Sequence, residues 1–268
     1  MTDDAHAHAV LTERRGHTLV VTINRPAARN SINADVHRGL GEAWDLAQQT
    51  DDIRVVVLTG AGEKTFCAGA DLKALGTSGP AGITPPETAH WGFAGVVKHH
   101  ITKPIICAVN GSALGGGTEL ALAGDLVVAG DTSSFGLPEV KRGLIAGAGG
   151  VFRLVSAIPR AVAMEMLLTG AAMSAADALR WGLINRVVPR AEVLTTALDL
   201  ADIVSANAPL AVQASKSVAR GIVEGTVPSE ARGWDLTEAA LARLTTSADT
   251  VEGIMAFIEK RDPRWTGK

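Results

Sequence analysis

The sequence is poor in the residues that build cross-linked or metal-bound proteins. Its 268 residues include two cysteines, no tyrosine and 4% aromatic residues. Cys67 and Cys107 do not form a C-x-x-C pair, and two cysteines alone do not make a zinc site. A disulfide framework is excluded as well, because such frameworks stabilise much shorter chains. We therefore expect a buried apolar core to stabilise the fold.

The sequence also lacks an excess of basic residues and any long apolar run. Lys and Arg total 25 against 28 Asp and Glu, giving a formal net charge of −3. Proteins dedicated to nucleic acid are normally basic, so we expect no nucleic-acid partner. No stretch approaches the length of a membrane span, and the first ten residues lack the apolar segment of a signal peptide. These features predict a soluble cytoplasmic protein with no membrane partner.

The histidines do not suggest a metal centre. His6 and His8 lie in the N-terminal segment, and His99 and His100 are adjacent, so they cannot easily chelate one ion from one face. The sequence offers no other ligand cluster and no dinucleotide-binding pattern. We therefore expect neither a metal nor a separate cofactor.

The apolar pattern predicts an α/β fold that ends in helices. Apolar runs rich in β-branched residues predict strands at residues 17–24, 55–60, 104–111 and 125–130. Helical periodicity begins at Ile32, recurs at about 118–123, and is the only pattern after about residue 156. We expect residues 1–10 to be a flexible tail, residues 76–86 to be a loop, and Pro189 and Pro209 to be joints.

A first segment of small residues, 66–72, reads Phe-Cys-Ala-Gly-Ala-Asp-Leu and follows the second predicted strand. Small side chains let a ligand approach the backbone closely. The simpler interpretation is an ordinary turn in which Asp71 caps the next helix.

A second segment, 110–120, leads from a strand through a glycine run into an apolar helix. The free N–H groups at such a helix start favour negative charge and could hold a substrate oxyanion, although the glycines could also form only a tight turn. Glu119 lies in the apolar helix. A buried glutamate there either faces a cavity with a perturbed pKa or pairs with a basic side chain.

A third segment, 135–140, places Glu139 directly after Pro138. Proline fixes the local backbone direction. By itself, this pattern favours a solvated surface carboxylate beside Lys141 and Arg142. Together the three segments predict more. Two backbone donors can stabilise a thioester enolate, while two carboxyl groups divide the proton transfers between water and carbon.

These motifs resemble the signature of the crotonase superfamily, which is the enoyl-CoA hydratase/isomerase family. The likeness extends from residue 24 to the C-terminus and rests on residues 66–72, 110–120, 135–139 and 147–150. It implies a spiral of ββα units in residues 11–195, followed by a helical oligomerisation region in residues 196–268. It also implies a trimer, or a hexamer of two trimers, acting on acyl-CoA thioesters.

The resemblance implies a role for individual residues. Glu119 and Glu139 would be the two catalytic acids, and the backbone N–H groups of Ala70 and Gly116 would form the oxyanion hole. The implied coenzyme A contacts are Ala28, Arg29, Ala68, Gly69, Ala70, Asp71, Gly116 and Lys260. Lys260 would reach the CoA phosphates of a neighbouring subunit.

Several activities remain open within this family. Members that only isomerise a double bond often keep one acid, so the two glutamates favour an enoyl-CoA hydratase over an isomerase or a thioester hydrolase. Residues 92–95, 178–182 and 259–265 resemble the carnitinyl-CoA dehydratase (crotonobetainyl-CoA hydratase) branch, whereas residues 144–150 are nearer to general hydratases. Trp91 could offer a cation–π face or belong to the core. An RNA-binding or scaffold member is the non-enzymatic alternative.

Two apolar stripes in the C-terminal region suggest assembly. One stripe comprises Ala197, Leu200, Ala201 and Val204. The other comprises Leu236, Ala239, Ala240 and Leu244. Such stripes are buried against a partner subunit or against the chain's own core.

Overall fold

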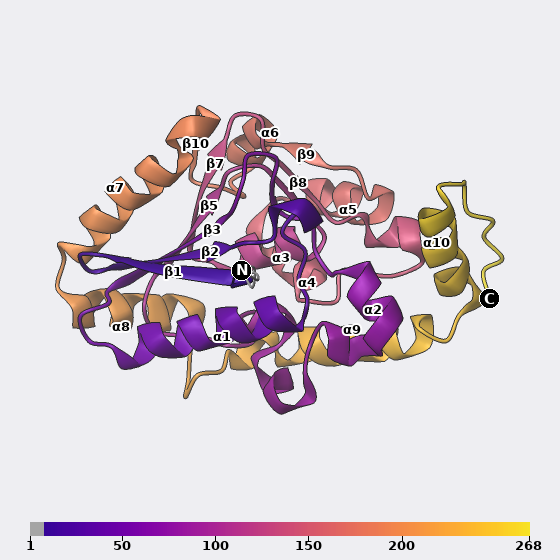
Figure 1. Cartoon of the computed structure of the whole chain (residues 1–268), viewed down its shortest axis with the longest axis horizontal. Helices are drawn as coiled ribbons and strands as arrows, with labels where there is room; N and C mark the ends of the chain where they lie inside the picture. The colour runs from indigo at the N-terminus through magenta and orange to yellow at the C-terminus, as the bar shows by residue number, and fades with distance from the viewer. Residues whose placement is uncertain (1–7) are drawn as a thin grey trace, which may run out of the picture.

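The computed structural model describes residues 8–268, in which two β-sheets are joined by a repeated connection (Figure 1). The larger sheet has the strand order β1-β2-β3-β5-β7-β10, and the smaller has the order β4-β6-β8-β9. From β3 onward, the chain passes from a strand of the larger sheet to one of the smaller sheet and then to a helix. This winding confirms the predicted spiral of ββα units.

The elements of the spiral follow one another in order. They are β1 (Val10–Arg15), β2 (Thr18–Ile23), α1 (Ala34–Gln49), β3 (Val55–Gly60), β4 (Thr65–Cys67), α2 (Leu72–Ser78), β5 (Ile105–Val109), β6 (Ser112–Leu114), α3 (Gly116–Ala123), β7 (Leu126–Gly130), β8 (Ser134–Gly136) and α4 (Gly150–Ala157). In the larger sheet β1 and β2 form an antiparallel hairpin, and the other neighbours pair in parallel. The four apolar runs therefore became strands as predicted.

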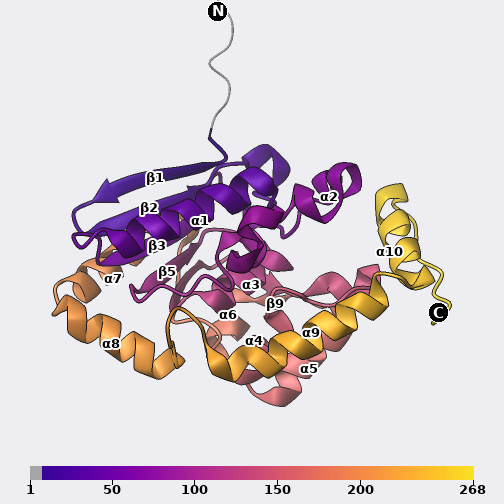
Figure 2. The ribbon, with the colours of Figure 1, turned by 90° about the horizontal axis from the view of Figure 1, so that it is seen from below.

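The remaining elements are mostly helical. They are α5 (Arg160–Thr169), β9 (Met173–Ser174), α6 (Ala175–Arg180), β10 (Arg186–Val188), α7 (Val193–Ser205), α8 (Pro209–Arg220), α9 (Ala231–Leu244) and α10 (Ala248–Glu259). Figure 2 shows α8 and α9 along one side of the molecule and α10 at the end far from α7. None of these described helices is long and apolar enough to cross a membrane.

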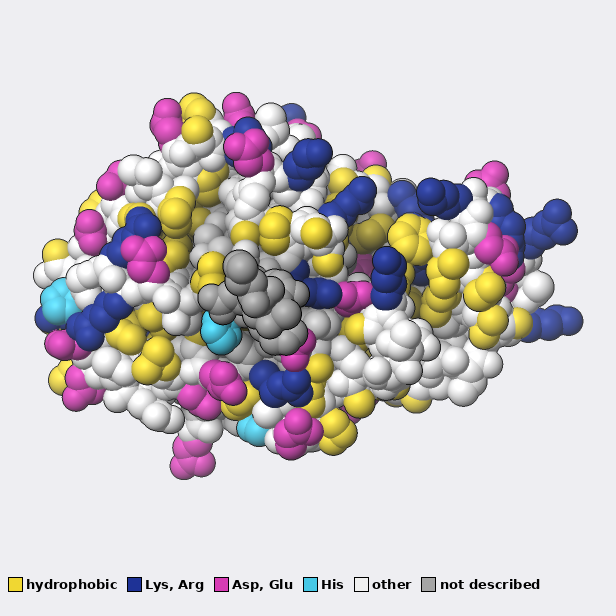
Figure 3. Space-filling model, viewed as in Figure 1, with side chains coloured by type: hydrophobic (Ala, Val, Ile, Leu, Met, Phe, Trp, Pro, Cys, Tyr) yellow, Lys and Arg dark blue, Asp and Glu magenta, His cyan; other side chains and the backbone are white. Residues whose placement is uncertain are grey.

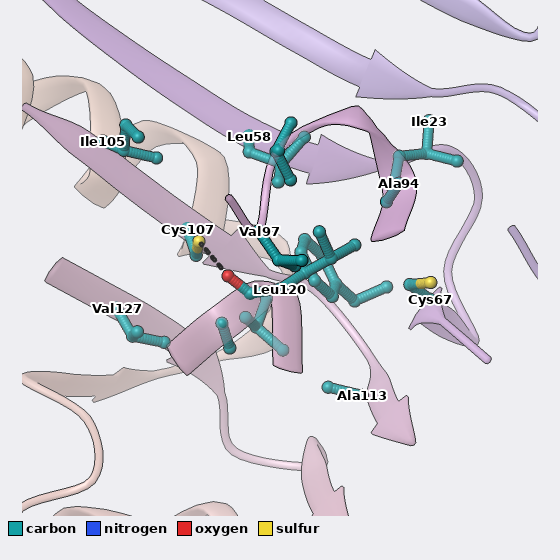
Figure 4. Packing of buried hydrophobic residues seen from close by; sticks show 14 of the residues in the cluster. Ile23, Leu58, Cys67, Ala94, Val97, Ile105, Cys107, Ala113, Leu120 and Val127 are labelled. Carbon is teal, nitrogen blue, oxygen red and sulfur yellow. Dashed lines mark hydrogen bonds between the residues drawn. The ribbon is translucent and has the colours of Figure 1, made fainter. Parts of the chain in front are cut away.

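The core surrounds α3, the helix that carries Glu119. Leu120 is 1% exposed and lies among apolar side chains from β3, β5 and β7 (Figure 4). The thiol of Cys107 donates a hydrogen bond to the Leu120 carbonyl at 3.8 Å. Because both cysteines are buried and free, they act as small apolar residues.

Four predictions about elements need correction. Val10 begins strand β1, so the predicted tail is too long, and its residues 1–7 lie outside the described part of the chain. The predicted loop 76–86 contains the end of α2 and the 3-10 helix Gly79–Gly82. The region after residue 156 is not purely helical, because β9 and β10 pair with β8 and β7. Ile32 precedes α1, which begins after the capping side chain of Asn33.

The first apolar stripe also differs from its prediction as a partner surface. Ala197 and Ala201 on α7 are fully buried against β3, β5 and β7 of the same chain. The stripe on α9 is different, because Leu236 is 63% exposed. The division of the chain at residues 195 and 196 stays a prediction.

Candidate active site

Two glycine turns bring Ala70 and Gly116 to the same place. Gly69 has a φ of +86°, which favours glycine, and an added Cβ there would lie 3.0 Å from the Gly116 nitrogen. Gly69 and the residue that follows it therefore lie directly against the start of α3. The segment from β4 and the segment from β6 meet because these strands are parallel neighbours.

The backbone N–H groups of Ala70 and Gly116 are available to a ligand. A parallel bridge joins Ile32 to Ala70 through the Ile32 N–H to the Gly69 carbonyl and the Asp71 N–H to the Ile32 carbonyl. This pattern leaves the Ala70 N–H pointing away from Ile32. Gly116 is the first residue of α3, where an N–H has no acceptor within the helix. Within residues 8–268 neither N–H has a recorded acceptor.

Glu119 is fastened by backbone groups of a distant turn. Its side chain is 3% exposed, and Oε1 accepts hydrogen bonds from the N–H of Ala148 at 2.7 Å and of Gly150 at 2.8 Å. A Cβ on Gly150 would lie 2.9 Å from that oxygen, so only glycine leaves room for the contact. The described Lys and Arg residues form no ion pair with Glu119. The alternative of a buried ion pair is therefore wrong.

Glu139 faces the same glycine turn from the opposite segment. It belongs to the 3-10 helix Pro138–Arg142, which follows β8. A Cβ on Gly115 would lie 2.9 Å from Glu139 Oε1, and Oε2 is buried without a hydrogen-bond partner among the described residues. The expectation of a solvated surface carboxylate is wrong. Proline turns this glutamate inward, toward the start of α3.

Both carboxyl groups resist ionisation. Burial, and then the charge of Glu139, raise the pKa of Glu119 to about 8, although the Gly150 and Ala148 N–H groups lower it. Burial raises the pKa of Glu139 to about 7. Near neutral pH the two groups can therefore hold and release protons, as an acid and a base must.

An aromatic segment covers the glycine turn. Phe93 begins the 3-10 helix Phe93–Gly95, and its ring lies 2.4 Å from where a Cβ on Gly116 would be. Trp91 stacks on His99 at a centroid distance of 5.2 Å and lies against Gly41 of α1. Trp91 is thus half-buried in packing contacts, as the core alternative predicted.

The predicted CoA-binding segments lie side by side. Ala28 ends the 3-10 helix Pro26–Ala28, and the Ala68 N–H donates to the Arg29 carbonyl at 3.1 Å. Asn30 is fully buried and ties this turn to β4 by donating to the Thr65 carbonyl at 2.8 Å. Ala28 and Arg29 therefore adjoin the segment that ends at Ala70.

The side chain of Asp71 serves the fold. It caps α2 by accepting from the Lys73 and Ala74 N–H groups, and its Oδ2 pairs with Arg25 at 2.9 Å. Partial burial raises the pKa of Asp71, but the hydrogen bonds from Arg25 and Ala74 outweigh it and lower the pKa overall. The interpretation of Asp71 as a helix cap is confirmed.

Lys260 is the residue that ends helix α10. It is exposed at the end of α10 and lines an open cavity of about 510 Å³ with Lys141, Arg142 and Phe257. Helix α10 packs on the 3-10 helix that carries Glu139, and the Thr250 hydroxyl donates to the Gly143 carbonyl at 2.7 Å. Within one chain, Lys260 thus shares a cavity with Lys141 and Arg142 of that helix.

The sequence pattern did not identify the donors that hold Glu119. The run 147–150 was recognised by its glycines, but its contact with Glu119 spans 29 and 31 residues. A single sequence gives no signal for such pairing. Within residues 8–268, no group of three or more His, Cys, Asp or Glu side chains is placed to hold a metal ion.

Comparison with known proteins identifies the family. Residues 13–268 match the model of the enoyl-CoA hydratase/isomerase family. A carnitinyl-CoA dehydratase of Proteus mirabilis is 41% identical over 95% of this chain and 97% of its own length. Enoyl-CoA hydratase EchA19 of Mycobacterium tuberculosis is 43% identical over 96% of each chain.

Solved structures agree with this match. A carnitinyl-CoA hydratase from Mycobacterium avium superposes with a TM-score of 0.95 at 54% identity, covering 97% of this chain and 99% of that one. EchA1_1 from Mycobacterium paratuberculosis gives a TM-score of 0.94 at 56% identity, covering 98% and 100%. Because sequence, fold and site geometry coincide, the chain belongs to the enoyl-CoA hydratase/isomerase family.

Proposed function

We propose that this protein is an enoyl-CoA hydratase, a hydro-lyase that adds water reversibly across the 2,3 double bond of an enoyl-CoA thioester. One observation carries the proposal: two buried carboxyl groups with raised pKa values, Glu119 and Glu139, flank a turn with two available N–H donors. An isomerase needs to move one proton between two carbons. Hydration requires two proton transfers, because water must lose a proton while the α-carbon gains one. Two carboxyl groups can each carry out one of these transfers.

The geometry supports a defined sequence of steps. The thioester oxygen accepts from the Ala70 and Gly116 N–H groups, which stabilise the enolate as it forms. Water lies between the carboxyl groups and adds its oxygen to C3. One glutamate, as carboxylate, takes the proton that water loses, and the other, as carboxylic acid, delivers a proton to C2. Dehydration is the reverse, so no redox change and no separate cofactor is required.

Carnitinyl-CoA dehydration is the second candidate, because relatives with that name match nearly the whole chain. Its substrate carries a trimethylammonium group, which an aromatic face could hold. Trp91 already stacks on His99, and the Trp234 ring already has Lys98 at 4.5 Å. These contacts favour an uncharged acyl chain.

A substrate panel tests the assignment. The wild-type protein is assayed with short, medium, long and branched 2-enoyl-CoAs, with crotonobetainyl-CoA and with a 3-enoyl-CoA. Hydration is read as loss of the conjugated thioester absorbance. We expect turnover of at least one uncharged 2-enoyl-CoA. Exclusive turnover of crotonobetainyl-CoA would favour the dehydratase, and gain of conjugation from the 3-enoyl-CoA alone would indicate an isomerase.

The non-enzymatic alternative is disfavoured by charge. The chain has 25 Lys and Arg against 28 Asp and Glu, and both signs are present across the face in Figure 3. A scaffold would also have no need of two buried carboxyl groups at one turn. A cytoplasmic location stays a prediction, which cell fractionation would test.

Assembly and CoA contacts belong to the same proposal. The exposed stripe at Leu236 on α9 supports self-association as a trimer or hexamer. In that assembly Lys260 would contact CoA phosphates of a neighbouring subunit. Ala28, Arg29 and the backbone from Ala68 to Asp71 would contact the bound CoA within one chain.

A further inference from the structure

Arg153 is a buried cation behind the turn that holds Glu119. It lies on α4 and is 6% exposed. Its Nε and Nη2 donate to the two carboxylate oxygens of Glu230 at 2.9 and 2.6 Å, and Nη2 also donates to the Val97 carbonyl at 2.8 Å. The guanidinium of Arg153 is therefore paired with a carboxylate and a carbonyl group. Removing a partner would leave a buried charge uncompensated, which destabilises a folded protein.

These contacts join three segments of the site. A Cβ on Gly149 would lie 3.3 Å from the Arg153 guanidinium carbon, so the side chain packs directly against the 148–150 turn. Val97 directly follows the turn after the 3-10 helix Phe93–Gly95. The ring of Phe93 lies over Gly116. Glu230 lies in the 3-10 helix Pro228–Glu230 that precedes α9. Arg153 is the point at which all three meet.

We infer that Arg153 is a positioning residue for Glu119, and that its pair with Glu230 transmits the placement of the C-terminal helices to the active site. The guanidinium fixes the 148–150 turn, whose N–H groups bind Glu119 Oε1, relative to the segment that carries Phe93. This inference rests on the proposed hydration, since it assigns Arg153 a part in orienting one of its two carboxyl groups.

Other charged groups surround Arg153 and must be considered in any titration. Glu119 lies on α3 and Glu230 lies in the C-terminal region. The positive charge of Arg153 acts to lower the pKa of both carboxyl groups. His100 lies between Arg153, Glu230 and the α8 cations, and burial lowers its pKa to about 4. Arg153 and Lys98 both lie over the Trp234 ring, at 5.3 and 4.5 Å from its centroid, and Lys98 pairs with Glu238 at 2.9 Å.

The test compares Arg153→Met, Arg153→Lys and the double variant Arg153→Met/Glu230→Gln with the wild-type protein. The control is Lys216→Met, which breaks another buried pair, Lys216 with Asp125 at 2.8 Å. Three quantities are measured: kcat and KM on the enoyl-CoA found by the panel, the melting temperature, and the carboxyl titration of Glu119 by carbon NMR, assigned with Glu119→Gln.

We expect Arg153→Met to lower kcat by about 100-fold, the cost of a misplaced reacting group, with a much smaller change in KM. The Glu119 titration should move upward, because a nearby positive charge is lost. Arg153→Lys should recover part of kcat. The double variant should regain melting temperature, since no charge is left unpaired, but not kcat.

Three results would overturn the inference, and two of them are recovery of wild-type kcat in the double variant and an unchanged Glu119 titration in Arg153→Met. Equal losses of kcat in Arg153→Met and Lys216→Met would also contradict it. Failure of the wild-type protein to hydrate any 2-enoyl-CoA would instead sink the proposed function. The NMR titration would then still show whether Arg153 acts on Glu119.

Discussion

Glu119 and Glu139 reach their positions because glycines make room for them. A side chain at Gly150 or at Gly115 would lie 2.9 Å from a carboxylate oxygen of one or the other. The hydrogen bonds to Glu119 Oε1 are then donated by backbone N–H groups, which every residue except proline supplies. At the residue scale, the proposed chemistry would therefore depend on small residues as much as on the two glutamates.

Replacing Glu139 by Gln should remove most activity and little stability. The amide keeps the size of the side chain but cannot exchange a proton, so we expect kcat to fall by about two to four orders of magnitude. Steady-state kinetics on the panel substrate measures the change. Glu42→Gln, at an exposed glutamate of α1, is the matched control and should behave as wild type. Near-normal turnover in Glu139→Gln would remove this residue from the mechanism.

The raised pKa values predict how stability depends on pH. Burial raises the pKa of Glu119 to about 8 and that of Glu139 to about 7, against 4.5 for an ordinary glutamate. The folded state therefore binds more protons, and stability falls as the pH rises from about 4.5 through 8. Relative to wild type, Glu119→Gln should gain on the order of 1–3 kcal/mol across this interval. Urea unfolding of both proteins at several pH values measures it, and parallel stability curves would contradict the raised pKa of Glu119.

Gly116→Ala should damage catalysis more than folding. The new Cβ would lie 2.4 Å from the Phe93 ring, which must move, and 3.2 Å from the Gly69 Cα. It therefore disturbs one oxyanion donor, a change that typically raises the barrier by about 2.7–4 kcal/mol. Gly76→Ala is the control, because a Cβ on this α2 residue meets open space. Full activity in Gly116→Ala would show that the donor assignment is wrong.

At the element scale, long runs were easier to predict than short ones. The strands β2, β3, β5 and β7 coincide with continuous apolar runs, which are visible in the sequence alone. Strands β4, β6 and β8 have three residues each, too few for a period, and they exist because neighbouring strands supply hydrogen bonds. The two acids could be named from motifs. Their surroundings, such as Ala148 and Arg153, come from contacts between distant segments and could not.

The helix that follows the oxyanion segment gives a prediction of its own. Asp71→Ala removes the cap of α2 and the partner of Arg25, so we expect a loss of about 1–2 kcal/mol in unfolding free energy. Asp71→Asn keeps a capping oxygen and should lose less. The cost should shrink in acid, because the lowered pKa means that stability from Asp71 is lost as the pH falls. An equal cost for both substitutions would show that the ion pair dominates.

At the scale of the whole molecule, the spiral core and the C-terminal helices differ in what they contribute. The core brings the acids and donors together within one chain. The helices α8 to α10 leave large apolar side chains uncovered, with Leu210, Leu236 and Ile258 each more than 60% exposed. Apolar side chains that gather into a large exposed patch mark interaction sites. The proposed self-association would cover them.

Light scattering tests this proposal directly. We expect the purified protein to be a trimer or hexamer at micromolar concentration, and truncation near residue 200 to give aggregated or unstable protein. Leu236→Glu should weaken assembly, since it places a charge in the apolar stripe. Leu46→Glu, on a 47% exposed residue of α1, is the control. A monodisperse monomer of about 28 kDa with full activity would refute assembly, along with the role of Lys260 in a neighbouring site.

The reliance on backbone donors has a consequence for how such a gene can evolve. Mutation replaces side chains but leaves each peptide N–H where the fold puts it. The N–H groups of Ala70, Gly116, Ala148 and Gly150 therefore persist through substitutions at neighbouring positions, provided that Gly116 and Gly150 themselves stay glycine. A duplicated copy can change Phe93, whose ring lies over Gly116, while keeping these N–H groups. Selection for a new substrate then acts on the side chains around these N–H groups and leaves the groups themselves in place.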